Sequence, residues 1–238
     1  MGGIVILDSA RVTTEEVVVA TRVLDDEMRM FCAAWKLSYW RVYHALASDH
    51  IPADHFRHTL LDDSDEHPEW QGWHSSGGFF GNPNATTLTR DSWWQITADH
   101  ENKEMRANPS VSIWRPWPGN PGWQIAQEVC DPTQADWQVV KEKLYGKSYN
   151  VKISNYILPA WFDEKAPPPY DAFNLCKKPG EIRPGGYAVI RNQTTGVRDN
   201  VWGKTLPFWA RERKAWVARK TRRLANGRAA MLLSNSER

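Results

Sequence analysis

Cysteine is scarce in this sequence and forms no pairs. The chain has three cysteines, Cys32, Cys130 and Cys176, which lie far apart and include no Cys-x-x-Cys motif. An odd number of widely spaced cysteines does not match a disulfide framework. We therefore expect reduced thiols and a fold that forms without disulfide bonds.

Long apolar runs are also missing. No run of about 18 apolar residues is present, so we expect no membrane-spanning helix. The first residues, Met-Gly-Gly-Ile-Val-Ile-Leu-Asp, lack the basic segment of a secretory signal peptide, so we expect a strand there and a cytoplasmic protein. A hydrophobic content of 41% and a charged content of 24% are typical of a soluble globular protein and exclude a disordered one.

The small net charge of +2 hides an uneven distribution. Residues 203–238 hold ten Lys or Arg and two Glu, a net charge of +8, which leaves −6 for residues 1–202. We expect one domain at 1–202 and a basic helical tail at 203–238, which either is solvated or contacts neighbouring protein subunits or nucleic acid. The tail residues predicted to make such contacts are Arg211, Arg213, Lys214, Arg219, Lys220, Arg222 and Arg223.

Apolar periodicity predicts a strand, a long helix and a second strand at the start of the chain. Thr13 followed by Glu15 and Glu16 is typical of a helix N-terminus, and apolar residues then recur at helical spacing to residue 35. Alternation over residues 40–46 predicts the second strand. Further strands are expected at 123–132 and 149–158, and residues 184–191 are expected to form a turn that leads into a last strand. Together these elements indicate an α+β fold.

Two segments between residues 49 and 84 are predicted to be mostly loop. Residues 49–69 contain seven acids and the histidines His50, His55, His58 and His67, but no pair has tight metal-ligand spacing. A solvated loop around a short strand at 58–61 is therefore favoured over a metal-collecting loop. The glycines and the Asn-Pro-Asn of residues 72–84 predict turns in a surface lobe.

The most informative segment is a helix expected from residue 93 to residue 107, with Asp91 or Ser92 as its cap. Residues 100–104 of this helix are His-Glu-Asn-Lys-Glu. Side chains four positions apart on a helix lie on one face, with Cβ atoms about 5–6 Å apart, so His100 and Glu104 can bind one ion. A common exposed helix face is the alternative interpretation.

Imidazole and carboxylate ligands suit zinc, and Glu101 would stand beside the ion to accept a proton from its bound water. A third ligand must then come from elsewhere in the fold. Residues 123–132 are predicted to be a strand that ends in acids, and Glu128 and Asp131 are the two candidates.

Four short motifs follow one another along the chain. They are His-Glu-x-x-Glu-Met-x-x-Asn-Pro at 100–109, Glu-Val-Cys-Asp-Pro at 128–132, Val-Lys-Ile-Ser-Asn-Tyr-Ile-Leu-Pro-Ala-Trp-Phe at 151–162 and Arg-Pro-Gly-Gly-Tyr at 183–187. In this order they resemble a poorly characterised family of bacterial and phage zincin-like metalloproteins. The resemblance spans about residues 3–192, and Gly-Trp-His-Ser at 72–75 stands where the family usually has Gly-Tyr-His-Asp.

The resemblance implies a zincin-like mixed sheet, with a long N-terminal helix and a metal-site helix, and a zinc-dependent peptidase or related hydrolase acting on a peptide substrate. It places the protein in the cytoplasm or in a phage virion. The implied site residues are His100 and Glu104 as ligands, Glu128 or Asp131 as third ligand, Glu101 as general base and His74 facing the site.

This chain departs from the family pattern at three positions in and around the predicted site. Asp99 stands where the family has Ser, and Asn108 stands where it has Asp. Lys103 adds a cation inside the motif. Because Lys103 is one residue away from Glu104, it is expected to point away from the ion.

Two other classes of function stay open from the sequence. One is a non-catalytic phage virion or assembly protein that keeps the scaffold and uses its basic tail and tryptophans for contacts with protein subunits or nucleic acid. The other is glycan binding by exposed tryptophans such as Trp114, Trp117 and Trp123.

Overall fold

The computed structural model describes residues 3–7, 11–46, 49–64, 70–76, 82–90 and 92–203. Within these ranges the fold is α+β, as predicted, with two α-helices and three sheets. The predicted basic helix lies outside them, and so do its expected contacts at Arg211, Arg213, Lys214, Arg219, Lys220, Arg222 and Arg223.

The elements follow one another as β1 (Gly3–Leu7), α1 (Thr14–Trp35), β2 (Arg41–Ala45), β3 (Phe56–Leu61), β4 (Gly72–Ser75), β5 (Asn84–Leu88), α2 (Trp94–Ala107), β6 (Trp114–Pro116), β7 (Trp123–Ala126), the short 3₁₀ helix η2 (Asp131–Thr133), β8 (Trp137–Leu144), β9 (Lys147–Ser154), the short 3₁₀ helix η3 (Pro159–Phe162), β10 (Tyr187–Asn192) and β11 (Arg198–Trp202).

The largest sheet is mixed, with strand order β2-β1-β3-β5-β4. Strands β2, β1, β3 and β5 are parallel, and β4 pairs antiparallel with β5 at the edge. Ile4, Val5 and Ile6 of β1 are fully buried, because a central strand of a mainly parallel sheet is covered on both faces.

Helix α1 has the bounds that the sequence predicts. The Thr13 side chain accepts a hydrogen bond from the backbone N–H of Glu16, and the Glu16 carboxylate accepts one from the backbone N–H of Thr13, which completes a capping box. The helix ends at Trp35, and the C-cap residue Lys36 adopts a left-handed conformation with φ of 53°. Its buried stripe, which includes Leu24 and Phe31, packs into the main core.

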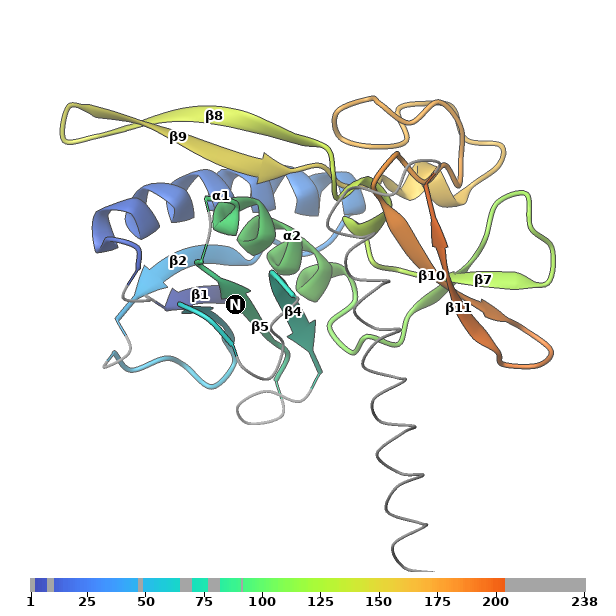
Figure 1. Ribbon diagram of the computed structural model, residues 1–238, viewed down its shortest axis with the longest axis horizontal. Coiled ribbons are helices and arrows are strands. Elements are labelled where there is room, and N and C mark those ends of the chain that lie inside the picture. Colours follow the sequence, from blue (N-terminus) through green and yellow to red (C-terminus); the bar gives the residue numbers. More distant parts are fainter. Residues whose placement is uncertain are drawn as a thin grey trace, which may run out of the picture.

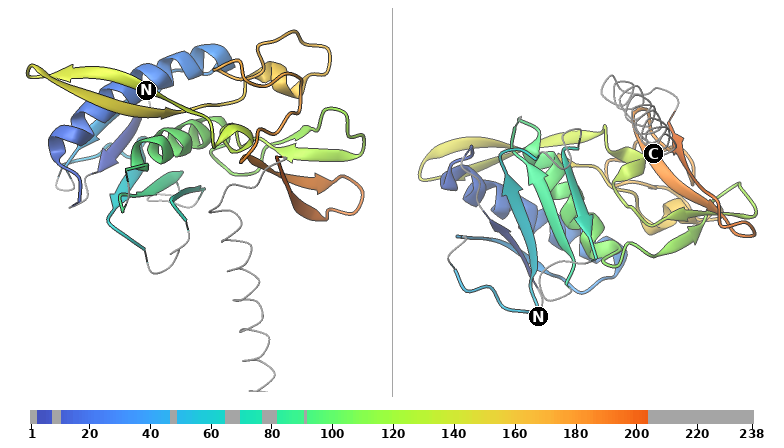
Figure 2. Two further views of the ribbon diagram at one scale, coloured as in Figure 1. Left: turned by 45° about the horizontal axis from the view of Figure 1, so that its top comes forward. Right: turned by 60° about the horizontal axis from the view of Figure 1, so that its bottom comes forward.

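The two helices lie between the main sheet and the β8–β9 hairpin (Figure 1). Helix α1 contacts β2 on one side and the hairpin on the other, and α2 contacts β4 and β5 on one side and β9 on the other. The second sheet, of order β11-β10-β7-β6, lies beside this layered part, and the views in Figure 2 agree with this arrangement. Helix α2 is therefore covered on both sides.

The prediction of a turn-rich lobe at 72–84 is wrong at both of its ends. Residues 72–75 form β4, and β5 begins at Asn84. A Cβ atom at position 72 would lie 2.5 Å from Cγ2 of Thr97 and 2.8 Å from the carbonyl oxygen of Thr86. Gly72 is thus needed where β4 passes close to α2, and it is not a turn residue.

Several predicted boundaries also differ from the structure. The N-cap of α2 is Trp93, whose side chain makes no capping hydrogen bond, and Asp91 lies outside the described residues. Strand β7 ends at residue 126, so the predicted acids follow it in a loop and in η2. Strand β8 was not predicted; it pairs with β9 through a turn at Tyr145 and Gly146, whose positive φ angles of 49° and 80° suit a two-residue hairpin.

A buried lysine fixes α2 against its neighbours. Lys103 has 0% side-chain exposure, and its Nζ lies 2.5 Å from Oδ2 of Asp99, 3.6 Å from Oε2 of Glu27 and 3.1 Å from the carbonyl oxygen of Ser154. The contacts therefore join α2 to α1 and to the end of β9. Burial by itself lowers the pKa of Lys103, but Asp99 and Glu27 raise it to about 12, so the side chain is charged.

Within the described part of the chain, no helix combines the length and the apolar character required to cross a membrane.

Candidate metal centre

Helix α2 and strand β4 bring the predicted residues together at the edge of the main sheet. His100, Glu101 and Glu104 lie on α2, and His74 lies on β4. The antiparallel β4–β5 pair and the parallel β5–β3 pair place His74 in one row with His58. Residues directly opposite each other in a sheet point to the same face, and here this is the face that α2 covers.

Glu104 lies at the centre of the cluster. Its Oε1 accepts hydrogen bonds from the backbone N–H groups of Cys130, at 3.0 Å, and Asp131, at 3.1 Å. Its Oε2 lies 3.2 Å from Nε2 of His100 and 3.8 Å from Nδ1 of His74. Although burial raises the pKa of Glu104, His100 and the other donors lower it below the ordinary value. Two backbone donors thus fix a charged carboxylate that directs one oxygen toward both imidazoles.

His100 lies between two carboxylates. Its Nε2 is 3.2 Å from Oε2 of Glu104 and 3.4 Å from Oδ1 of Asp131. Burial by itself lowers the pKa of His100, but these two acids raise it well above its ordinary value. The surroundings therefore favour positive charge next to Nε2.

His74 contacts the two remaining carboxylates of the cluster. Its Nδ1 lies 3.1 Å from Oε2 of Glu101, at hydrogen-bond distance, and its Nε2 lies 3.6 Å from Oε2 of Glu128. Only 7% of the His74 side chain is exposed. Burial by itself lowers the pKa of His74, but Glu101, Glu128 and Glu104 raise it to about 9.

Asn108 holds Glu128 in place. Its Nδ2 donates a hydrogen bond to Oε1 of Glu128 at 2.9 Å, while its Oδ1 accepts from the backbone N–H groups of Ser112 and Ile113, each at 3.0 Å. The departure from the family pattern thus supplies a donor that an aspartate would lack. Burial and the charge of Glu104 raise the pKa of Glu128 well above its ordinary value.

The Arg-Pro-Gly-Gly-Tyr segment supports the loop that carries Asp131. The backbone N–H of Arg183 donates to the carbonyl oxygen of Pro132 at 2.8 Å, and a Cβ atom on Gly186 would collide with that same oxygen. Burial and Glu104 raise the pKa of Asp131 to about 7, against the lowering effect of hydrogen bonds with His100 and Tyr187.

The structure brings the six residues predicted for the metal site into one cluster: His74, His100, Glu101, Glu104, Glu128 and Asp131. Among the described residues, two sets of three donors have ligand atoms within 4.8 Å of one another, namely His100–Glu104–Cys130 and His74–Glu104–Glu128. Asp131 belongs to neither set, although it contacts His100. These buried groups could hold a metal ion.

Two residues of the cluster were not predicted from the sequence: Cys130, a possible donor, and Asn108, which supports Glu128. The signal for Cys130 was its place beside Asp131 in the motif at 128–132. Burial raises the pKa of the Cys130 thiol, so the sulfur is protonated unless a cation displaces its proton. For Asn108, the only signal was its departure from the family's Asp.

The described histidines of residues 49–64, which are His50, His55 and His58, are in neither donor set of the cluster. The predicted short strand is present as β3, and its His58 is fully buried. Nδ1 of His58 lies 2.7 Å from Oδ1 of Asn102, and Nε2 lies 2.9 Å from Oγ1 of Thr87. Burial lowers the pKa of His58, so this residue is a neutral link that ties the motif helix to the sheet. His50 is exposed, and His67 lies outside the described residues.

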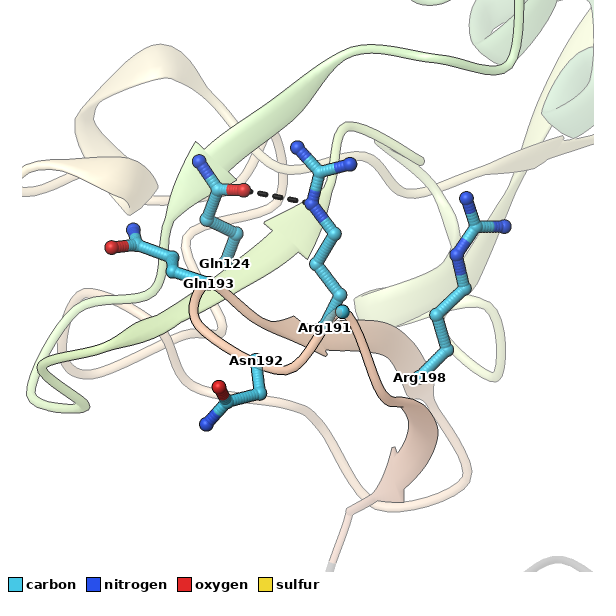
Figure 3. Close-up of a pocket in the computed structure, with 6 residues that line it drawn as sticks. Gln124, Arg191, Asn192, Gln193 and Arg198 are labelled. Atoms are coloured by element: carbon cyan, nitrogen blue, oxygen red, sulfur yellow. Dashed lines mark hydrogen bonds between the residues drawn. The ribbon is translucent and has the colours of Figure 1, made fainter.

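The tryptophans considered for glycan binding lie on or next to β6 and β7. The guanidinium carbons of Arg191 and Arg198 lie 4.5 Å and 5.2 Å from the centroid of the Trp114 ring. Nε of Arg191 also donates to Oε1 of Gln124 at 2.8 Å, at the rim of an open polar pocket of about 430 Å³ (Figure 3). A sugar would have to displace these guanidinium groups to stack on the ring surface that they cover, and glycan binding stays a prediction.

Comparisons with protein-family models, curated proteins and solved structures find no match to this chain.

Proposed function

We propose that this protein is a zinc-dependent hydrolase with a zincin-like site, and that its substrates are peptides. The observation that carries the proposal is the position of His100 Nε2 between Oε2 of Glu104 and Oδ1 of Asp131, with Glu101 one residue away on the same helix. The resemblance of the four motifs supplies the reaction class.

The donor atoms around His100 fit a zinc ion. Two ligand atoms bound tetrahedrally to zinc at about 2.0–2.1 Å are separated by about 3.3 Å. The observed separations from His100 Nε2 are 3.2 Å to Glu104 and 3.4 Å to Asp131. The ion would replace the Nε2 proton and be held by His100 and by Glu104 or Asp131 beside it. Cys130 is a further candidate for the third position, because its sulfur lies within 4.8 Å of the His100 and Glu104 donor atoms.

The chain's own residues then have distinct roles. Zinc, when bound, supplies a Lewis acid that polarises a carbonyl group and lowers the pKa of a coordinated water. His74 donates from Nδ1 to Oε2 of Glu101, which orients this carboxylate and leaves its second oxygen to accept the proton of the attacking water. Glu104 keeps its charge through its two backbone hydrogen bonds.

Metal content tests the proposal directly. We expect the full chain, supplied with zinc and then separated from free ion, to retain at least one zinc per chain, and His100→Ala to lose one equivalent because Nε2 is a ligand. His50→Ala removes an exposed histidine and should retain the wild-type content. Mass spectrometry of the metal gives the answer, and a wild-type chain that retains no zinc would overturn the proposal.

The third ligand is tested by two neighbouring substitutions. Asp131→Asn removes a charged oxygen that faces His100 Nε2, so we expect its zinc affinity to fall by at least 10-fold, whereas Cys130→Ser should change the affinity by less than about 3-fold. Competition with a chromogenic chelator measures both affinities. The opposite ranking would assign the third position to the Cys130 sulfur, which lies within 4.8 Å of the His100 and Glu104 donor atoms.

A further inference from the structure

Two buried polar atoms face each other on the side of the cluster away from His100. They are Nε2 of His74 and Oε2 of Glu128, which are 3.6 Å apart. Neither has a hydrogen-bond partner within the described residues. The two side chains are only 7% and 10% exposed, so they are largely shielded from bulk solvent. Buried polar atoms without partners are rare in native proteins and require an explanation.

Neither tautomer of His74 explains this pair. With its Nδ1 proton donated to Glu101, a neutral imidazole presents a lone pair at Nε2 toward a carboxylate oxygen, and two acceptors then face each other. With a proton on Nε2, or on Oε2 of Glu128, a hydrogen bond would join the two atoms, but their separation of 3.6 Å exceeds the usual length of such a bond, about 2.7–3.2 Å. A cation between the two atoms satisfies both of them.

The surroundings of His74 are those of a metal ligand. A histidine that binds a metal commonly donates its other ring N–H to a carboxylate, which fixes the tautomer and orients the ring. His74 has this arrangement with Glu101, at 3.1 Å. A separation of 3.6 Å between Nε2 and Oε2 of Glu128 also suits two ligands of one ion with bonds of about 2.0–2.1 Å.

We propose that His74, Glu128 and Glu104 form a second site for a divalent transition-metal ion, next to the site at His100, so that the centre is dinuclear. The donor atoms of these three residues lie within 4.8 Å of one another. Glu104 is a member of both donor sets: its ligand atom lies within 4.8 Å of those of His74 and Glu128, and its Oε2 lies 3.2 Å from Nε2 of His100. The inference rests on the proposed function for the first site.

The formal charges of the cluster agree with two ions. The carboxylates of the cluster bring four negative charges into a buried region when ionised: Glu101, Glu104, Glu128 and Asp131. Both histidines are neutral when they bind metal. One divalent ion leaves a net charge of −2, and two divalent ions balance the cluster. Lys103, on the same helix, does not contribute, because it is paired with Asp99 and Glu27.

A second ion extends the chemistry of the centre. Paired metal ions about 3.5–4 Å apart can stabilise both the attacking and the leaving oxygen of a displacement. Such a pair is possible here because Glu104 is common to the His74 and the His100 donor sets.

Metal stoichiometry of the full chain tests the second site. After equilibration with excess zinc and removal of free ion, we expect about two zinc ions per chain for the wild type and for the His50→Ala control. His74→Gln and Glu128→Gln should each retain about one, and near-ultraviolet circular dichroism of each variant reports whether its fold is intact. Two substitutions on different elements keep the test valid if one of them fails to fold.

Electron paramagnetic resonance with Mn²⁺ gives an independent readout of proximity. Two Mn²⁺ ions that share a carboxylate are magnetically coupled, so we expect a broadened spectrum for the wild type and the resolved hyperfine pattern of an isolated ion for His74→Gln. These two results together with the zinc content would support the proposal.

Three outcomes would overturn it. If the wild type binds one zinc per chain and His74→Gln retains it, the centre is mononuclear and lies at His100. The proposed function then stands without the second site. If the wild type binds one zinc per chain and His74→Gln binds none, His74 is a ligand of a single ion. No zinc in the wild type overturns both this inference and the proposed function.

Discussion

Replacing Glu101 by Gln is expected to remove hydrolysis while the metal stays bound. Glutamine keeps the shape of the side chain and can still accept the hydrogen bond from Nδ1 of His74, but its amide cannot take up the proton of the attacking water. Loss of a general base costs about 10²–10⁴-fold in rate. Hydrolysis of a peptide library, followed by mass spectrometry and paired with zinc content, measures both parts of this expectation.

Glu142→Gln is the matched control, because it makes the same chemical change on β8, outside the cluster. Its turnover and its zinc content should equal those of the wild type. Turnover by the Glu101→Gln variant within about 3-fold of the wild type would exclude Glu101 as the general base. Such a result would favour the non-catalytic alternative, in which the scaffold serves subunit or nucleic-acid contacts.

Replacing Lys103 by Ala should cost about 3–5 kcal/mol of the free energy of unfolding. The substitution removes the ammonium group and leaves the carboxylates of Asp99 and Glu27 buried without their cation. Burial already raises the pKa of Glu27, although Lys103 acts to lower it. The contact between α2 and the carbonyl oxygen of Ser154 is also lost. Urea denaturation followed by tryptophan fluorescence measures the change.

Lys143→Ala on the exposed surface of β8 is the control, with an expected change within about 0.5 kcal/mol. A triple variant, Lys103→Met with Asp99→Leu and Glu27→Leu, removes all three charges and should recover much of the loss, because an apolar replacement of a buried ionic group is often neutral. A cost below about 1 kcal/mol for Lys103→Ala would show that the ion pair does not hold α2 in place.

The two α-helices could be predicted because their signals are local. The bounds of α1 follow from the cap at Thr13 and a stripe of apolar residues, both of which lie within the helix itself. The end of α2 at residue 107 likewise follows from the Asn-Pro at 108–109. Spacing also placed His100 and Glu104 on one face, and the structure shows their side chains in contact.

Strand β4 could not be predicted from its own four residues. Gly-Trp-His-Ser contains a glycine and a serine that are typical of turns, and its strand conformation depends on pairing with residues 84–87 of β5. The glycine is there for a close approach to Thr97 of α2, a contact that no local pattern encodes. From the sequence, His74 was expected only to face the site, as the resemblance implies. Its contacts with Glu101 and Glu128 are a finding of the structure.

The sequence by itself determined the α+β class, the helix that carries the motif and the set of acids and histidines from which a site could be built. The tertiary structure decided how these groups pair: Asp131 lies against His100, Glu128 lies against His74, and Glu104 directs one oxygen toward both histidines. It also buried Lys103 against α1, where the sequence showed only a cation that points away from the site. The reason is physical, because helical spacing acts over a few residues, whereas contacts between β4, α2 and the loop after β7 depend on the packing of segments distant in the chain.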